Sequence, residues 1–395
     1  MTTAETQAQR AELVGRATDL VGLIRTRAAW QEENRLLHDE VLQGLVDAGL
    51  FRLRVPKRYG GYESDVRTVC EVIAELARGD GSVGWTASTL TIGSWLVGLF
   101  PDEVQDEIFA DPDALVGSSV SPNGIAVPTD GGVVLNGKWA FSTGALHSRW
   151  FIHSALLATE DGGHAPVMVA VPLTDLTVVD DWYTSGLRGT GSVTTVVRDL
   201  FVPGARVLPL IPVLAENRHR SKLNAAAPMW RIPFSPITAA GAAAVPLGLA
   251  RAALEVFLER LPERRISYTH YERQSEAPIT HLQVAEARMR IDEAEFHVRR
   301  AAGRVDGKSR AGEAWSLEER AVARMDMGAS CLLGKEAVDL LNTASGGSSI
   351  YSDQPMQRIE RDIQTVNLHG VLHPNTNLEL YGRVLCGLEP NTQLI

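Results

Sequence analysis

Residues 133–144 read Val-Val-Leu-Asn-Gly-Lys-Trp-Ala-Phe-Ser-Thr-Gly, and their pattern differs from that of the sequence on either side. A β-branched run that reaches Asn136-Gly137 is typical of strands joined by tight turns. Further short β-branched runs, at 167–171 and 193–197, are separated by turns such as Asp161-Gly162-Gly163. The pattern predicts a small antiparallel β domain, built as a barrel.

The sequence on both sides of this region has helical periodicity instead. Before it, apolar residues recur at helical spacing, as in Leu42, Leu45 and Val46. After it, the stretches 278–302 and 315–345 each place apolar residues on one broad face. We therefore expect an α+β chain with an N-terminal helical domain (1–111), a central β domain (112–215) and a C-terminal helical bundle (216–395).

Composition excludes several classes of protein. The 395 residues include 38 basic and 48 acidic side chains, a net charge of −10, which does not suit a nucleic-acid partner. Cys70, Cys331 and Cys386 are odd in number and widely spaced, so neither a disulfide framework nor a zinc site is predicted. A reducing cytoplasm fits this usage best.

No targeting or membrane segment is predicted. The first residues lack the apolar core of a secretory signal. The longest apolar stretch, 239–254, contains Pro246 and Arg251 and is shorter than the roughly 20 residues that cross a bilayer. We expect a soluble protein without a membrane partner.

Local catalytic motifs do not select a reaction. The string Gly186–Ser192 (Gly-Leu-Arg-Gly-Thr-Gly-Ser) lies among predicted strands, so it is not a dinucleotide-binding turn. It is either a loop that wraps a cofactor or an ordinary turn. His369 and His373 are four residues apart, but Gly370 and Pro374 flank them, so no metal site is predicted.

Three strings nevertheless resemble one known family. They are Arg35–Gly61 with its Tyr-Gly-Gly turn, Leu135–Gly144, and Gly186–Ser192 followed by Asp199-Leu-Phe-Val-Pro203. In these strings and in its three-part order, the chain resembles the acyl-CoA dehydrogenase superfamily. The resemblance implies an N-terminal helical domain, a central antiparallel β-barrel and a C-terminal four-helix bundle.

Within that superfamily the chain looks like the two-component flavin-dependent monooxygenases. The dehydrogenase Glu-Gly-Thr and Thr-Glu-Pro strings are absent, and Ser118-Ser-Val-Ser-Pro-Asn-Gly124 stands in place of the latter. The monooxygenase features are Asp80–Trp85, Thr143–His147, Arg361-Asp362 followed by His369, and Tyr381–Arg383. The resemblance implies reduced flavin (FMN or FAD), O2, a C4a-hydroperoxyflavin and a separate NAD(P)H:flavin reductase. An acyl-CoA dehydrogenase-type oxidoreductase is the alternative.

The substrate class depends on one departure from the pattern. Phenol hydroxylases of this group place a histidine eight residues after the tryptophan, and that position here is Gly93. An amine already has the lone pair that a phenol gains by losing a proton, and the string 369–383 resembles that of amino-sugar N-oxygenases (nitrososynthases) of natural-product biosynthesis. N-oxygenation of an amine or amino sugar is therefore expected first, and aromatic or polyketide hydroxylation second.

Two residues are expected to carry the chemistry. The resemblance places Thr143 at the flavin N5 and His369 over the same face. A histidine with a pKa near 6.5 suits proton transfer at neutral pH. The structural alternatives are a strand hydroxyl satisfied by the backbone for Thr143 and a helix-end imidazole for His369.

The remaining flavin contacts come from the same strings. The expected flavin-binding residues in the first half are Ser119, Ser121, Trp139, Ser142, Thr143, Gly144, Arg188 and Ser192. In the second half, Arg273 and Gln283 fall where the family crosses the subunit boundary to the flavin phosphate, which implies a homotetramer. The displaced arginine favours FMN, or a loosely held flavin, over tightly bound FAD.

Overall fold

The structure is a computed structural model that describes residues 3–111, 113–216, 218–392 and 395. In chain order, its helices and strands are α1 (Thr3–Asn34), α2 (Asp39–Asp47), α3 (Val66–Gly79), α4 (Gly81–Val97), α5 (Asp102–Ile108), β1 (Val116–Thr129), β2 (Gly132–Trp139), β3 (Trp150–Ala158), β4 (His164–Pro172), β5 (Thr177–Val179), β6 (Thr194–Pro203), β7 (Val207–Pro209), α6 (Leu210–Leu214), α7 (Phe234–Arg260), α8 (Pro278–Ala311), α9 (Leu317–Ser345), α10 (Pro355–Asn367) and α11 (Pro374–Leu385).

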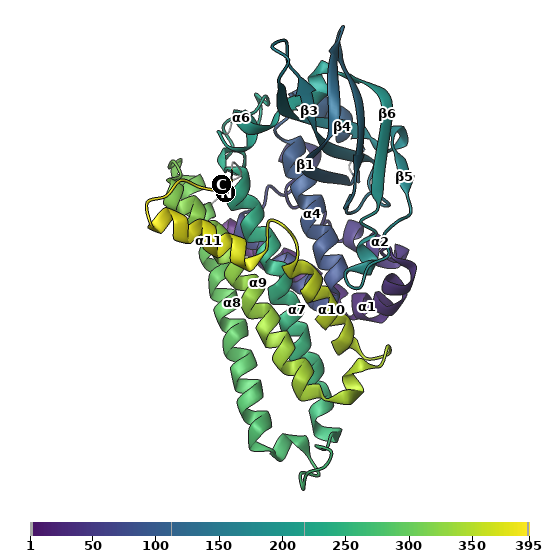
Figure 1. Ribbon diagram of the computed structural model, residues 1–395, viewed down its shortest axis with the longest axis vertical. Coiled ribbons are helices and arrows are strands. Elements are labelled where there is room, and N and C mark those ends of the chain that lie inside the picture. Colours follow the sequence, from purple (N-terminus) through teal and green to yellow (C-terminus); the bar gives the residue numbers. More distant parts are fainter. Residues whose placement is uncertain (1–2, 112, 217, 393–394) are drawn as a thin grey trace.

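Helices, then a sheet, then helices follow one another along the chain, as the sequence predicts. Figure 1 shows the sheet at one end of the molecule and the long helices α7, α8 and α9 extending to the other end. The helices α7, α8, α9 and α10 pack against one another as the expected four-helix bundle, and α11 packs on α9. The exact boundaries at residues 111 and 215 stay a prediction.

The sheet differs from the expected antiparallel barrel. Its strand order is β5-β6-β2-β1-β3-β4-β7, and the edge strands β5 and β7 each pair with one neighbour among the described strands. One pair, β1 with β3, is parallel, with Val116 opposite Trp150. The connection after β2 explains this pairing, because it returns the chain to the start of β1 and β3 then runs in the same direction as β1.

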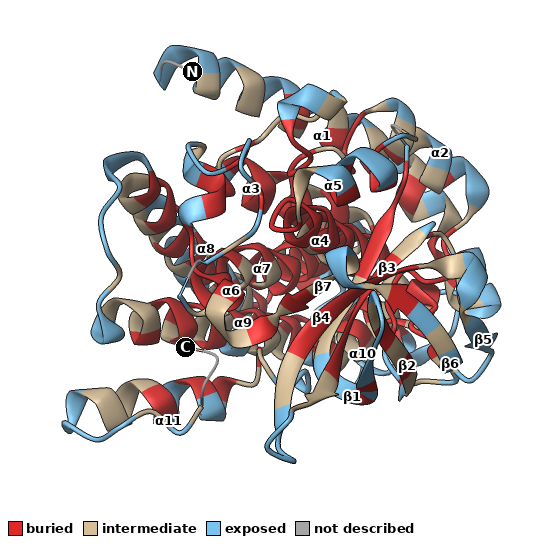
Figure 2. Cartoon of the chain, turned by 90° about the horizontal axis from the view of Figure 1, so that it is seen from above, coloured by how far each residue is buried: buried red, intermediate tan, exposed pale blue. Residues whose placement is uncertain are grey.

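Two helices form the centre of the molecule, α4 and α7. Most residues of both are buried, and Figure 2 shows them red among the surrounding elements. A Cβ added at Gly248 on α7 would lie 2.3 Å from the backbone oxygen of Ala74, so α3 and α7 approach backbone to backbone. On α4, a Cβ added at Gly84 would lie 2.7 Å from the Cα of Ala77 on α3, so α4 is also tightly packed and gives rigid support to what packs on its remaining surface.

The segment Phe234–Glu263 is long and apolar enough, by length and composition, to cross a membrane. It is longer than the apolar stretch found in the sequence, because α7 continues through Pro246. In its most apolar window, 78% of the residues are buried inside the protein. A mostly buried apolar helix is typical of a protein core.

Candidate active site

The turn after β2 joins the sheet to α4. Phe141 and Gly144 have φ values of 60° and 77°, in the left-handed region that favours glycine. The Ser142 N–H donates to the Val193 carbonyl at 3.0 Å, and a Cβ added at Gly144 would lie 2.9 Å from Leu90 on α4. The turn therefore places Thr143 between the sheet and the central helix.

Thr143 is linked by hydroxyl groups to the loop at 186–192. Its Oγ1 lies 2.7 Å from Ser192 Oγ, which lies 2.8 Å from Thr190 Oγ1. Thr190 Oγ1 donates to the Leu187 carbonyl at 2.8 Å. All three hydroxyl residues are buried, so the Gly186–Ser192 string forms a structured wall beside Thr143.

A buried carboxyl pair fixes the same loop to the bundle. The Leu187 N–H donates to Asp362 Oδ1 on α10 at 2.6 Å. Burial, and then the nearby Asp80, raise the pKa of Asp362 to about 8. Burial also raises the pKa of Asp80, which caps α4 through the N–H groups of Ser82 and Val83. Two neighbouring buried carboxyl groups disfavour double ionisation, so Asp362 holds a proton at neutral pH.

Arginine side chains connect α1, α10 and this loop. Arg361 pairs with Glu32 on α1 at 2.5 Å and donates to the Ser185 carbonyl at 2.5 Å. Arg188, an expected flavin contact, is half-buried and donates through Nε to the Glu32 carbonyl at 3.2 Å. Its contact in this chain therefore holds the loop against α1.

His369 follows the C-terminal end of α10 and packs on α4. Its ring lies 5.1 Å from the ring of Trp85 in an edge-on arrangement, and its Nδ1 accepts from the Val371 N–H at 3.3 Å. With Nδ1 as acceptor, the proton of the neutral ring lies on Nε2. His369 thus presents one N–H donor.

The protonation state of His369 corrects the sequence-based expectation. His369 is exposed at the surface of this chain, yet desolvation by the protein atoms near its ring lowers its pKa to about 4. At pH 7 the imidazole is neutral, because the surrounding atoms disfavour its charged form. The expected acid with a pKa near 6.5 is therefore replaced by a neutral hydrogen-bond donor.

One face of α4 stays partly open beside these groups. Thr89 and Ile92 are partly exposed on an otherwise buried helix, and they follow Trp85 by four and seven residues. Gly93 has no room for a side chain, because a Cβ there would lie 1.9 Å from the Val116 carbonyl of β1. At position 93, where phenol hydroxylases of this group have a histidine, α4 contacts β1 directly, and this contact leaves no space for a side chain.

Trp139 and Ser142, two of the expected flavin-binding residues, have buried side chains. The Trp139 indole is fully buried in the sheet core, stacks on His153 at 4.1 Å and donates to the Ser154 carbonyl at 2.8 Å. Ser142 Oγ donates to the Trp139 carbonyl and contacts Thr195 Oγ1 at 2.9 Å. Through these contacts both side chains support the turn from within, and the expected flavin-binding role of the two residues stays a prediction.

Ser119 and Ser121 lie where β1 becomes irregular. The pairing between β1 and β3 shifts register between Ser119 and Pro122. Ser119 is half-buried and Ser121 is exposed, whereas Val120 between them packs on the core. The expected role of Ser119 and Ser121 in binding flavin stays a prediction.

Arg273 and Gln283 lie far from the other predicted residues in this chain. They belong to the α7–α8 connection and the start of α8, and Figure 1 shows that region at the end of the molecule opposite the sheet. Arg273 is exposed and pairs with Glu276 at 2.5 Å. A role for either residue in the same site requires a second subunit.

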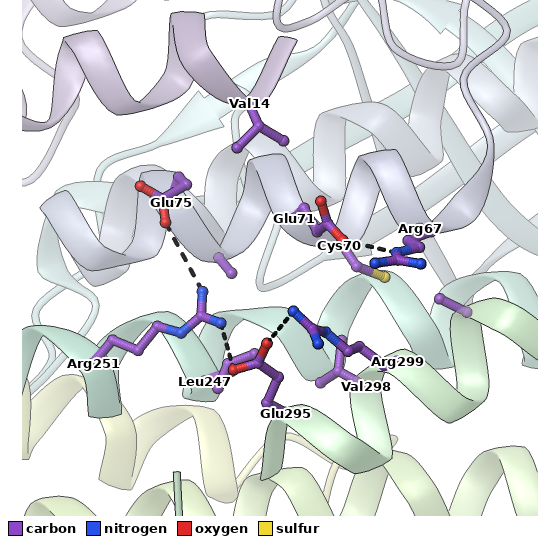
Figure 3. Close-up of a pocket in the computed structure, with 12 residues that line it drawn as sticks. Val14, Arg67, Cys70, Glu71, Glu75, Leu247, Arg251, Glu295, Val298 and Arg299 are labelled. Carbon is purple, nitrogen blue, oxygen red and sulfur yellow. Dashed lines mark hydrogen bonds and ion pairs between the residues drawn. The ribbon is translucent and has the colours of Figure 1, made fainter. Parts of the chain in front are cut away.

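The cavity shown in Figure 3 is a different feature, with a volume of about 150 Å³ between α1, α3, α7 and α8. Charged residues around it neutralise one another: Glu295 pairs with Arg251 at 2.8 Å and with Arg299 at 2.5 Å, and Arg67 pairs with Glu71 at 2.8 Å. The lining includes none of the predicted site residues, and its charges have partners.

Sequence reasoning missed the roles of Thr190, Asp80 and Asp362. Thr190 lies inside the Gly186–Ser192 string, and Asp362 belongs to the Arg-Asp pair that carried the resemblance. The contact between Leu187 and Asp362 joins segments 175 residues apart, and the Thr143–Ser192 contact spans 49 residues, so no local pattern reveals these roles. The burial of Trp139 had a signal, because it shares strand alternation with Val133 and Leu135.

Comparison with known proteins identifies the family. Residues 6–111 match the model of the acyl-CoA dehydrogenase N-terminal domain, and residues 240–374 match that of the C-terminal domain. The chain is 32% identical to the oxygenase subunit HsaA of a flavin-dependent monooxygenase from Mycobacterium tuberculosis, over 95% of this chain and 96% of that protein. It is 30% identical to the oxygenase component of an FADH2-dependent resorcinol hydroxylase from Rhizobium sp., over 96% of this chain and 95% of the relative.

A solved structure shows the same relationship. XiaF from Streptomyces sp., in complex with FADH2 and glycerol, matches with a TM-score of 0.94 and 34% identity, over 99% of both chains. The chain therefore belongs to the acyl-CoA dehydrogenase superfamily. Within it, the chain is an oxygenase component of the two-component flavin-dependent monooxygenases.

Proposed function

We propose that this protein uses reduced flavin and O2 to hydroxylate a small aromatic molecule. The arrangement along α4 is the observation that carries the proposal. Trp85 contacts His369, and five residues later Leu90 supports the Thr143–Gly144 turn. The same helix therefore contacts both His369 and the Thr143–Gly144 turn, and its partly open face lies on the side of Trp85.

The site suits the ring system of a flavin. When bound, reduced flavin supplies the electrons that activate O2. In this proposal the buried hydroxyl of Thr143 lies beside the flavin ring, and the buried residues of the loop Gly186–Ser192 exclude water from one side. His369 donates a hydrogen bond through Nε2 to a negatively charged oxygen. The neutral ring stabilises this oxygen by donation and keeps its proton. FMN and FAD both fit the proposal, because the residues of this chain contact the flavin ring, whereas a second subunit binds the phosphate groups.

Aromatic hydroxylation takes the place of the N-oxygenation expected first. The relatives compared include a resorcinol hydroxylase, and the amino-sugar N-oxygenase resemblance finds no support among them. The contact with β1 leaves no room for a base at position 93 of α4. We therefore propose that the substrate is an aromatic molecule whose ring reacts without a base at position 93 to remove a proton from it.

A substrate panel tests this proposal. Chemically reduced FMN or FAD, O2 and the purified protein are mixed with resorcinol, indole or an amino sugar, and products are measured by mass spectrometry. The proposal predicts a hydroxylated product from at least one aromatic ring. Oxygenation of the amino sugar alone, or peroxide release without any product, contradicts it.

Two partners complete the proposal. The names of relatives as oxygenase components imply a separate reductase, which we propose is an NAD(P)H:flavin reductase. We also propose a homotetramer, since Leu282, Met289 and Phe296 form an exposed apolar row on α8 with a spacing of seven residues.

A further inference from the structure

The three hydroxyl groups that end at Leu187 form a series with a defined direction. Each hydroxyl carries a single proton, whereas a carbonyl oxygen only accepts. The Leu187 carbonyl accepts from Thr190 Oγ1 at 2.8 Å, from the Thr190 N–H at 3.2 Å and from Trp182 Nε1 at 3.1 Å. Because the carbonyl oxygen has no proton, the 2.8 Å contact with Thr190 Oγ1 uses the hydroxyl proton of Thr190.

The direction of the other two bonds follows from this first one. The 2.8 Å contact between Thr190 and Ser192 needs a proton, and only Ser192 has one to give. The 2.7 Å contact between Ser192 and Thr143 then needs the proton of Thr143. Thr143 Oγ1 is left with acceptor capacity alone toward the site.

The surroundings keep the series in this arrangement. Thr190 and Ser192 are 1% and 3% exposed, so bulk water cannot easily reach their hydroxyl groups and change the direction of their hydrogen bonds. Leu187 is held by Asp362 through its N–H. A Cβ at Gly186 would lie 2.2 Å from the Arg361 carbonyl, so the loop packs directly on the backbone of α10.

We infer that Thr190 and Ser192 are positioning residues that fix Thr143 as a hydrogen-bond acceptor, so that the site selects reduced over oxidised flavin. The chemistry of flavin N5 supplies the selection: N5 carries a hydrogen in reduced flavin and only a lone pair in oxidised flavin. An acceptor opposite N5–H forms a hydrogen bond, whereas an acceptor opposite a bare N5 leaves both groups unsatisfied. The inference rests on the proposed function, in that it takes flavin as the ligand beside Thr143.

Thr190→Val tests the direction of the series with little change in shape. Without the Thr190 hydroxyl, Ser192 donates to Thr143, and Thr143 gains a free proton that it can offer to oxidised N5. The dissociation constants of oxidised and reduced FMN and FAD are measured under anaerobic conditions by flavin absorbance and fluorescence. We expect the wild type to bind the reduced form about tenfold more tightly, and the ratio to fall toward one in Thr190→Val.

Two further variants separate this effect from general damage. Thr190→Ser keeps the hydroxyl and should retain the wild-type ratio. Thr195→Val removes a buried hydroxyl that bonds Ser142 and His153 outside the series, and it should leave the ratio unchanged. If Thr190→Val does not fold, loss of the preference in Ser192→Ala, with Thr195→Val unaffected, is the expected result.

The possible failures are distinguishable. Equal affinity of the wild type for both redox forms overturns the inference but leaves the proposed function standing, and so does an unchanged ratio in folded Thr190→Val. Wild-type protein that binds neither oxidised nor reduced flavin overturns the proposed function itself.

Discussion

At the scale of single residues, the environment of His369 decides what this side chain can do. Its identity and its place after Arg361-Asp362 are visible in the sequence, but its pKa depends on the protein atoms around the ring. Desolvation beside Trp85 makes it a neutral donor in place of the expected acid. A residue's type was therefore predictable here, whereas its charge depended on the tertiary structure.

The neutral state predicts a flat titration. The folded pKa of about 4 lies below the usual value near 6.5, so the unfolded chain binds the proton more tightly. His369 therefore favours the folded state fully above pH 6.5, and this contribution is lost as the pH falls toward 4. NMR of the imidazole should show no titration of His369 between pH 5.5 and 8, and a midpoint near 6.5 would contradict the burial argument.

Removal of the donor predicts uncoupling. His369→Ala should lower the rate of product formation about 10²-fold, as loss of a single donor to a charged oxygen does elsewhere. It should raise hydrogen peroxide release at equal flavin occupancy, measured with a dye assay beside product quantification. His373→Ala, four residues further along the chain, is the matched control. Unchanged coupling in His369→Ala would remove the residue from the mechanism.

Gly93 predicts a cost for any side chain on α4 at that point. The Cβ of Gly93→Ala would lie 1.9 Å from the Val116 carbonyl, so α4 and β1 must move apart. We expect a loss of about 1–3 kcal/mol in the free energy of unfolding, measured by denaturant titration. Gly22→Ala on α1 is the control, since its Cβ meets nothing within 4 Å. A Gly93→Ala variant as stable as Gly22→Ala would contradict this account of the missing histidine.

At the scale of elements, α10 couples the bundle to the sheet domain. Asp362 binds the loop before β6, while His369 follows the end of the same helix. The helix order and the sheet region were predictable because each leaves a local periodicity in the sequence. The parallel β1–β3 pair and the Leu187–Asp362 contact were not, because both depend on which distant segments meet.

The carboxyl pair predicts a pH dependence of stability. The unfolded chain ionises Asp362 near pH 4, whereas the folded pKa is about 8, so stability is lost as the pH rises between these values. Asp362→Asn mimics the protonated form and still accepts from the Leu187 N–H. Its melting temperature relative to the wild type should therefore rise from pH 5 to pH 8.5. Asp353→Asn, an exposed change just before α10, should show no such trend. A constant difference for Asp362→Asn would show that the pair does not hold a proton.

At the scale of the whole molecule, the separation of Arg273 and Gln283 from Thr143 requires an assembly if all of them serve one site. Light scattering should report four chains for the wild type. Phe296→Glu, in the apolar row of α8, should reduce this number, whereas Val127→Glu at an exposed position on β1 should not. A wild-type monomer that binds flavin with full affinity would exclude Arg273 and Gln283 from the site.

The central claim is that this chain transfers an oxygen atom from O2 to an aromatic ring. The most direct measurement uses ¹⁸O2, chemically reduced flavin supplied without a reductase, and an aromatic substrate from the panel that yields product. The account predicts that the hydroxylated product carries one ¹⁸O atom and that none enters from H2¹⁸O. Product labelled from water, or bleaching of oxidised flavin by an acyl-CoA in the absence of O2, would contradict it.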